Sequence, residues 1–296
     1  MAIRSIQAAT DFSPRAQRAV ERAALLAQEN QATLYLLHVL PVISWKMFGK
    51  ILFEHPLVTE KQLYDAAMTR LHEVAEDCRK RHGIRVESHV DIGKPHECIR
   101  DHARKHAVNL TVLGPHAGNF GRDLFIGSTA IRMLHGAIEP ALIAETPPQA
   151  PYHTVLVAVD FSDISYAAID AAAVVAPKAA TFALHVYDVE FEGKMRYASV
   201  EQSVIQKYHD AAESEALRLM GEFLSTAGQR SPILPMVRNG YPSRVILDEA
   251  RNLHADLIVM GKHGQAGLEE FFFGSVTEGV LYGLDRDLLV VTEQRA

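Results

Sequence analysis

Short apolar runs alternate with longer amphipathic stretches along the whole chain. In the C-terminal half, β-branched and aliphatic residues form strand-like runs at 154–159, 181–186, 233–238, 256–260 and 288–292. The segments between them place apolar residues at helical spacing, at 162–176, 200–227, 243–252 and 275–282. Strands that alternate with helices pair in parallel, and continuously apolar strands are covered on both faces. The pattern therefore predicts a doubly wound α/β domain.

The N-terminal half repeats this order of elements, with strands at 3–9, 33–39, 85–90, 110–113 and 141–144. Asp11 has its counterpart in Asp160, 149 positions later, while Gly114 and Gly127 have theirs in Gly261 and Gly274, 147 positions later. So steady an offset indicates two tandem copies of one domain of ordinary size. A proline-rich link at 146–151 separates the copies, and we expect domains at 1–147 and 152–296.

Composition narrows the class of protein. The 296 residues, 48% hydrophobic and 22% charged, are typical of a globular chain with room for two cores. The net charge of −6 argues against a nucleic-acid-binding surface, which needs clustered lysine and arginine. Cys78 and Cys98 form no metal or disulfide pattern, and neither a membrane span nor a signal peptide is evident. We therefore expect a cytoplasmic protein without nucleic-acid or membrane partners.

The most specific local pattern is a set of glycines after the fourth strand of the second copy. Gly261, Gly264 and Gly274 follow the spacing G-x2-G-x9-G, and Ser275 opens the next helix. Glycines let the backbone approach an anion, and a helix N-terminus presents unpaired N–H groups and a positive dipole end. The pattern predicts a phosphate site. Ser275 and Thr277 can add hydroxyl donors to it, although either hydroxyl also suits a helix cap.

Asp160 directly follows the first strand of the second copy. In an open parallel sheet, ligands bind outside the carboxyl ends of the strands, where the strand order reverses. If strands one and four are neighbours, Asp160 and Gly261 border the same crevice, and Asp160 can accept hydrogen bonds from a nucleoside. The alternative is an N-cap for the following helix. That alternative suits Asp11 as well, because Pro14 fits a first helical turn.

These residues carry a resemblance to the universal stress protein family, which covers both copies almost end to end. The second copy holds the family's full nucleotide signature, G-x2-G-x9-G-[ST], in Gly261, Gly264, Gly274 and Ser275. The resemblance implies a five-stranded parallel sheet of order 3-2-1-4-5 with four helices in each domain. It also implies that the last strands, at 141–144 and 288–292, pair the domains edge to edge, which would cover two open sheet edges.

For the ligand, the resemblance implies ATP, held together with Mg²⁺. The glycine loop and the first helical turn, formed by Ser275, Val276 and Thr277, would hold the ribose and phosphates. Asp160 and the backbone around Val186 would face the adenine.

The first copy keeps only part of the signature. Ala117 replaces the second glycine, and Ala130 replaces the threonine of the first helical turn. A lost charge-assisted hydrogen bond costs about 1.5–3 kcal/mol, so we expect nucleotide binding there to be weaker by about one to three decades. The residues of this weaker candidate site are Asp11, Val39, Gly114, Gly127 and Ser128.

Histidines suggest three further interpretations. His102 and His106 lie four residues apart on a predicted helix, but the sequence dictates no third ligand, and we expect no metal there. His38 and His185 occupy equivalent strand positions, which favours a shared structural role. His263 lies in the glycine loop of the second copy, where a phosphate contact is open to it.

The function that these patterns favour is that of an ATP-binding regulatory protein of the stress response, with nucleotide mainly in the C-terminal domain. Little or no turnover is expected, because the sequence holds neither a P-loop nor an assignable nucleophile and base. One alternative is a nucleotide-independent interaction protein. It would bind a protein partner through the aromatic segments at 41–56 and 188–198, which otherwise fold back as loops. The other alternative is a slow ATPase. Beyond the intrachain pair of domains, a homodimer is left open.

Overall fold

The computed structural model describes residues 2–42, 60–115, 128–189, 192–227, 232–263 and 274–292. The chain divides into two compact units, Ala2–Pro151 and Tyr152–Ala296, and each is described by itself. Two of the predicted site residues, Gly127 and Gly264, lie outside the described residues, as does nearly all of the aromatic segment at 41–56.

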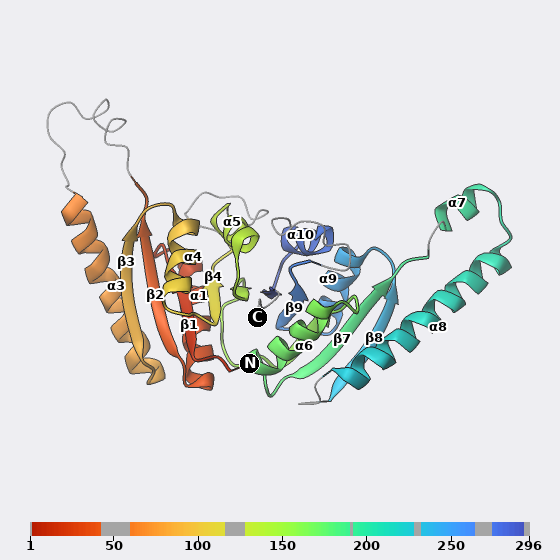
Figure 1. The fold of residues 1–296 in the computed structure, drawn as a ribbon, viewed down its shortest axis with the longest axis horizontal. Helices are drawn as coiled ribbons and strands as arrows, with labels where there is room; N and C mark the ends of the chain where they lie inside the picture. The colour runs from red at the N-terminus through yellow and green to blue at the C-terminus, as the bar shows by residue number, and fades with distance from the viewer. Residues whose placement is uncertain are drawn as a thin grey trace, which may run out of the picture. The chain divides into compact units, whose positions relative to one another are not determined.

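The first unit is a parallel sheet in the order β3-β2-β1-β4-β5. Its strands are β1 (Ser5–Ala9), β2 (Thr33–Leu40), β3 (Val86–Ile92), β4 (Leu110–Leu113) and β5 (Ala141–Ile143). Helices α1 (Pro14–Asn30) and α3 (Glu60–His82) pack together on one face, while α4 (Pro95–Lys105) and α5 (Ser128–Gly136) pack together on the other (Figure 1).

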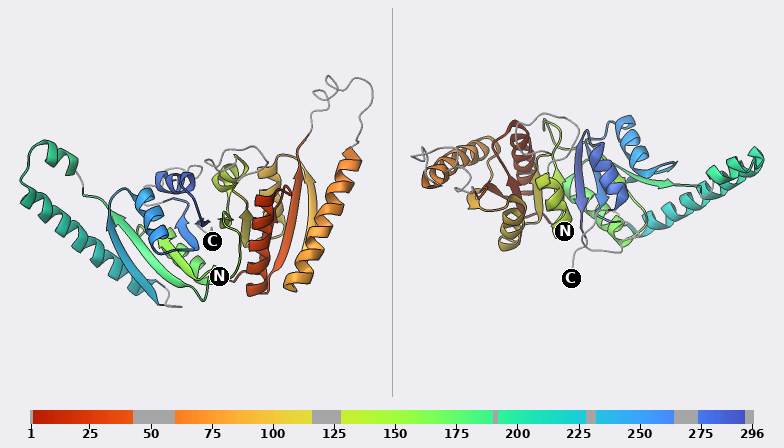
Figure 2. Two further views of the ribbon diagram at one scale, coloured as in Figure 1. Left: turned by 180° about the vertical axis from the view of Figure 1, so that it is seen from behind. Right: turned by 90° about the horizontal axis from the view of Figure 1, so that it is seen from above.

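The second unit repeats this arrangement in the order β10-β9-β6-β7-β8. Its strands are β6 (Thr154–Ala158), β7 (Ala180–Tyr187), β8 (Ile233–Asn239), β9 (Leu257–Gly261) and β10 (Asp287–Val291). The helices that cover its two faces are α6 (Asp163–Val175), α8 (Gln202–Thr226), α9 (Pro242–Asn252) and α10 (Ser275–Tyr282), and the layers are seen from behind and from above in Figure 2. Within the described ranges, none of the helices is long and apolar enough to cross a membrane.

The predicted doubly wound α/β fold is confirmed in both units, with every predicted strand observed to within two residues of its expected ends. Predominantly apolar runs form strands that are buried along their whole length, as in β4 and β10. The expectation of a plain loop at 188–198 was wrong, because Glu192–Tyr197 form the short helix α7. Nor does every aromatic residue of that segment fold back, since Tyr197 is 93% exposed.

A buried hydrogen bond joins the start of the second unit to its last strand. The Tyr152 hydroxyl donates to Oδ2 of Asp287 over 2.7 Å, and both residues are buried. Removal of the donor leaves a buried acceptor with one partner fewer, so Tyr152→Phe should lower the free energy of unfolding by about 1–3 kcal/mol. Urea denaturation measures this loss. A variant as stable as the wild type would show that the bond contributes nothing.

Candidate functional site

The turn from the first strand to the first helix is built in the same way in both units. Phe12 and Phe161 hold left-handed backbone conformations, with φ of 63° and 66°, which bulky residues rarely adopt. Their rings lie against the imidazoles of His38 and His185, with centroids 4.4 and 4.2 Å apart. Each Nδ1–H donates to a main-chain carbonyl just after the first strand, over 2.8 and 2.9 Å. The two histidines therefore fix the strand–helix turn that borders the site, which is a shared structural role.

The aspartates that follow these strands organise the same turns. Oδ1 of Asp160 accepts hydrogen bonds from the Ser162 N–H over 3.1 Å, from the Ser165 hydroxyl over 2.8 Å and from the Ser162 hydroxyl. Oδ1 of Asp11 accepts from the Ser13 N–H over 2.9 Å. These contacts close the turns that precede the helices, whose N-caps are Ser13 and Ser162, so the alternative of an aspartate N-cap is wrong. They also hold both carboxylates at the carboxyl end of the first strand.

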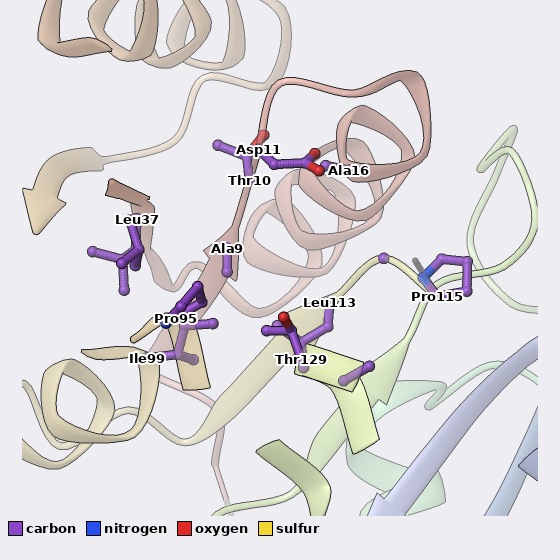
Figure 3. A pocket seen from close by; sticks show the side chains of 13 residues that line it. Ala9, Thr10, Asp11, Ala16, Leu37, Pro95, Ile99, Leu113, Pro115 and Thr129 are labelled. Carbon is purple, nitrogen blue, oxygen red and sulfur yellow. The ribbon is translucent and has the colours of Figure 1, made fainter. Parts of the chain in front are cut away.

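A crevice that is partly open to solvent lies at the carboxyl ends of β1, β2 and β4 in the first unit (Figure 3). Three of the residues predicted for this unit line it, namely Asp11, Val39 and Gly114. Two further lining residues, Pro95 and Ile99, come from α4 and were not predicted. The repeated Gly-x-Pro landmark at 93–95 and 240–242 was the sequence signal that could have pointed to this wall.

The walls of this crevice are mainly apolar. Leu37, Ile99 and Leu113 form the floor and side, and Ala130 stands at the start of α5 where the second unit has a threonine. Pro115 lies at the end of the glycine-containing strand and has no N–H to offer an anion. The first unit therefore has a shaped crevice with few donors near the expected phosphate position.

In the second unit, β9 ends at Gly261, and Gly274 is the N-cap of α10. Among the described residues, no side chain caps this helix. In its first turn Ser275 is exposed and Val276 is half-buried. The hydroxyl of Thr277 donates to the Gly261 carbonyl over 3.0 Å and is buried, so it braces the strand–helix junction. The first-turn hydroxyl left facing outward is that of Ser275.

Lys262 follows Gly261 directly. Its N–H donates to the Val291 carbonyl over 2.8 Å and is therefore not free to bind an anion, while its own carbonyl accepts from the Gly274 N–H over 3.1 Å. The side chain is buried, and burial lowers the pKa of its ammonium group. His263 is half-buried beside it. The second unit thus carries a cationic residue where the first has Pro115.

Gly261 has a packing role of its own. A Cβ atom at this position would lie 2.6 Å from Cγ2 of Ile164 and 3.0 Å from the His263 carbonyl. The strand end therefore approaches α6 so closely that only glycine fits. This requirement holds whether or not a ligand is present. Val186, at the end of β7, and Asp160, after β6, lie at the same edge of the sheet as Gly261.

Acidification is expected to destabilise the second unit through His185. Burial lowers the pKa of this imidazole, against the opposing effect of its hydrogen bond to the Val159 carbonyl. Its unfolded pKa is near 6.5, so the neutral form stabilises the fold, and that contribution is lost as the pH falls below about 6.5 towards the lower folded value. Denaturation at pH 7 and pH 5 should show a smaller loss of stability for His185→Gln than for the wild type. Equal losses would contradict this assignment.

The fold and the crevice together define a class of proteins that contain tandem doubly wound α/β domains. Each domain has a sheet of order 3-2-1-4-5 and a glycine-containing turn from strand to helix at its carboxyl edge. The sequence profile of the universal stress protein family matches residues 2–144 and 151–292. The chain belongs to the universal stress protein family and contains two of its domains in tandem.

Relatives support the tandem arrangement. A universal stress protein of Mycolicibacterium smegmatis is 28% identical over 295 residues, which cover 95% of this chain and 94% of that protein. Universal stress protein A homolog 1 of Coxiella burnetii is 31% identical over 140 residues, 46% of this chain and 92% of that protein. The crystal structure of a universal stress protein from Archaeoglobus fulgidus superimposes with a TM-score of 0.71 at 18% identity, covering 97% of this chain and 98% of that one. This last likeness shows the fold alone.

Proposed function

We propose that this chain is a cytoplasmic ATP-binding regulatory protein of the stress response, with its main nucleotide site in the C-terminal domain. The observation that carries the proposal is the position of Gly261 and Gly274, which end β9 and cap α10 within a complete G-x2-G-x9-G-[ST] signature. Among the described residues, no side chain caps the helix N-terminus that follows, an arrangement suited to phosphate. Many members of this family bind ATP, which agrees with this chemistry.

Within this proposal, each candidate residue has a distinct task. The N–H groups of the first turn and the Ser275 hydroxyl bind phosphate, with Mg²⁺ bound by the phosphates themselves. The buried Lys262 adds positive charge beside the loop. Asp160 and the Val186 backbone face the nucleoside, as the first-unit counterparts Asp11 and Val39 face their crevice.

The first domain is assigned the weaker site. Its crevice has the right position, but Pro115 stands where the second domain has the cationic Lys262. Nucleotide binding changes the partner surface mainly in the domain that holds the nucleotide more tightly. The second domain is therefore the regulatory one in this proposal.

Acid extraction of the purified protein, followed by chromatography, tests for bound nucleotide. Released ATP or ADP supports the proposal. If nothing is released and millimolar ATP with Mg²⁺ leaves the melting temperature unchanged, the chain instead acts without nucleotide, through partner surfaces. A slow ATPase would hydrolyse ATP over multiple turnovers, and Gly274→Val would abolish this activity. We expect the wild type to hydrolyse ATP no faster than that variant.

A further inference from the structure

Three imidazoles converge in the first domain, away from the glycine turns. His89 lies on β3, while His102 and His106 lie in the last turn of α4 and at its C-cap. The ring centroid of His89 lies 4.7 Å from that of His102 and 5.1 Å from that of His106, and the last two are 4.3 Å apart. Each imidazole offers a ligand atom within 4.8 Å of the others. Within the described residues, the Nε2 atoms of all three are buried and have no hydrogen-bond partner. Buried polar atoms are normally satisfied, so three orphaned nitrogens at one point call for a shared partner.

A neighbouring amide fixes the orientation of the central imidazole. The Gln7 Nε2 group donates to the Ile99 carbonyl over 3.1 Å, which turns its Oε1 towards His102. Because that oxygen can only accept, the 2.5 Å hydrogen bond at His102 Nδ1 requires the proton on Nδ1. The lone pair of His102 therefore lies on Nε2, directed into the cluster. Metal-binding histidines are oriented by a second hydrogen bond in the same way.

The protonation state also suits a cation. Burial lowers the pKa of His102 to about 3 and lowers that of His89 below its usual range, with the neighbouring imidazoles adding to both shifts. Neutral imidazole is the form that binds metal. Tyr35 packs its ring against all three histidines, with centroids 5.0–6.2 Å away, and closes one side of the cluster.

The fold itself does not demand these polar residues. The strand register pairs Gln7 with Tyr35 and Leu37 with His89 in the first domain, and Leu156 with Phe182 and Leu184 with Met236 in the second. The positions equivalent to Gln7, His89 and His106 are occupied by Leu156, Met236 and Leu253. The position equivalent to His102 holds Glu249, which pairs with Arg238 on β8 over 3.1 Å. The fold therefore accepts other residues at all four positions, and packing alone does not require the histidines.

We propose that His89, His102 and His106 form a binding site for a divalent transition metal of the zinc type. Three imidazoles without a carboxylate select zinc, cobalt, nickel or copper over magnesium and calcium. Nitrogens at about 2.0–2.1 Å from a tetrahedral zinc are about 3.4 Å apart, so modest side-chain rotation closes the cluster on the ion. The fourth position takes water or an incoming ligand, and the bound metal ties α4 to β3. The site is independent of nucleotide in the second domain.

Cobalt and zinc titrations of the metal-free, full-length chain test the proposal without nucleotide. Cobalt(II) should give the intense visible absorption of tetrahedral coordination, saturating at one ion per chain, and zinc should displace it. Zinc in 100-fold excess over its Kd should raise the melting transition of the first domain by about 5–10 °C.

The second domain supplies the matched variants. In His89→Met/His106→Leu, residues that the fold already accepts replace two ligands, so the protein should fold and lose at least about 100-fold in zinc affinity. Gln7→Leu should bind zinc about 10- to 100-fold more weakly, because His102 loses its orienting acceptor. His96→Gln, on the same helix but outside the cluster, should bind as the wild type does.

Two results would overturn the proposal: no tetrahedral cobalt spectrum in the wild type, or the same spectrum and zinc affinity in the double variant. If the double variant does not fold, His106→Gln replaces it, and unchanged zinc affinity in that variant also counts against the site.

Discussion

ATP with Mg²⁺ at 100-fold excess over its Kd should raise the melting temperature of the wild-type chain by about 5–10 °C, and Gly274→Val should abolish this rise. Binding at that excess stabilises the folded state by about 2.7 kcal/mol, and each kcal/mol shifts a domain of this size by about 2–4 °C. Gly274 has φ of −61° and ψ of 142°, which valine adopts without strain. The added side chain should therefore block the approach of the phosphate and leave the backbone path intact.

The matched control is Gly127→Val, the same change at the corresponding position of the first domain. It should leave most of the ATP-dependent rise in place, because the second domain binds more tightly in this account. Valine is also a poorer helix cap than glycine, at a cost of about 1 kcal/mol, which the melting temperature without ATP measures separately. Equal loss of the ATP effect in both variants would refute the asymmetry between the domains.

Gly261→Ala should destabilise the second domain by about 1–3 kcal/mol in the absence of any ligand. Its Cβ would overlap Ile164 at 2.6 Å and the His263 carbonyl at 3.0 Å, and overpacking of this kind forces the backbone to move. Chemical denaturation measures the loss of stability, and hydrogen exchange shows which of the two domains has lost it. This glycine is therefore unsuitable as a test of nucleotide binding, in contrast to Gly274.

Gly114→Ala provides the comparison, since Gly114 is the counterpart of Gly261 in the first domain. The nearest atoms to its added Cβ would be main-chain atoms of Arg15 and Ala16 at 3.3 and 3.4 Å, a much milder contact. The loss of stability should be clearly smaller than for Gly261→Ala. If the two substitutions cost the same, the close packing against Ile164 is not what requires glycine at the end of β9.

Sequence patterns were sufficient for the strands because burial on both faces leaves a strong signal, whereas the strand order followed from the family resemblance. The runs that became β4 and β10 are apolar apart from Thr111 and Asp287, and both strands are buried throughout. The tandem repeat added a second, independent signal, since each element had to appear twice. Local turn chemistry was predicted in part: Pro14 lies in the first turn of α1 as expected, but the N-cap is Ser13 and not Asp11.

The parts that sequence could not supply depend on contacts between distant segments. His89 is brought to His102 by the pairing of β3 with β2 and the packing of α4, and no local spacing encodes that meeting. His89, the third ligand, could therefore not be predicted from the spacing of His102 and His106. The same holds for Thr277, whose hydroxyl is directed to the Gly261 carbonyl by the return of α10 against β9.

The left-handed backbone at Phe12 and Phe161 was equally hidden, because aromatic residues disfavour that conformation. Packing against His38 and His185 holds it in place. Helix α7 formed where aromatic residues suggested a loop, since the run Glu192–Tyr197 contains several good helix formers.

A crystal of the chain grown with millimolar ATP and Mg²⁺ tests the central claim most directly. The account predicts triphosphate density in the C-terminal domain, against the N-terminus of α10, with the base towards Asp160 and Val186. An empty second-domain crevice, or nucleotide confined to the crevice of the first domain, would contradict it.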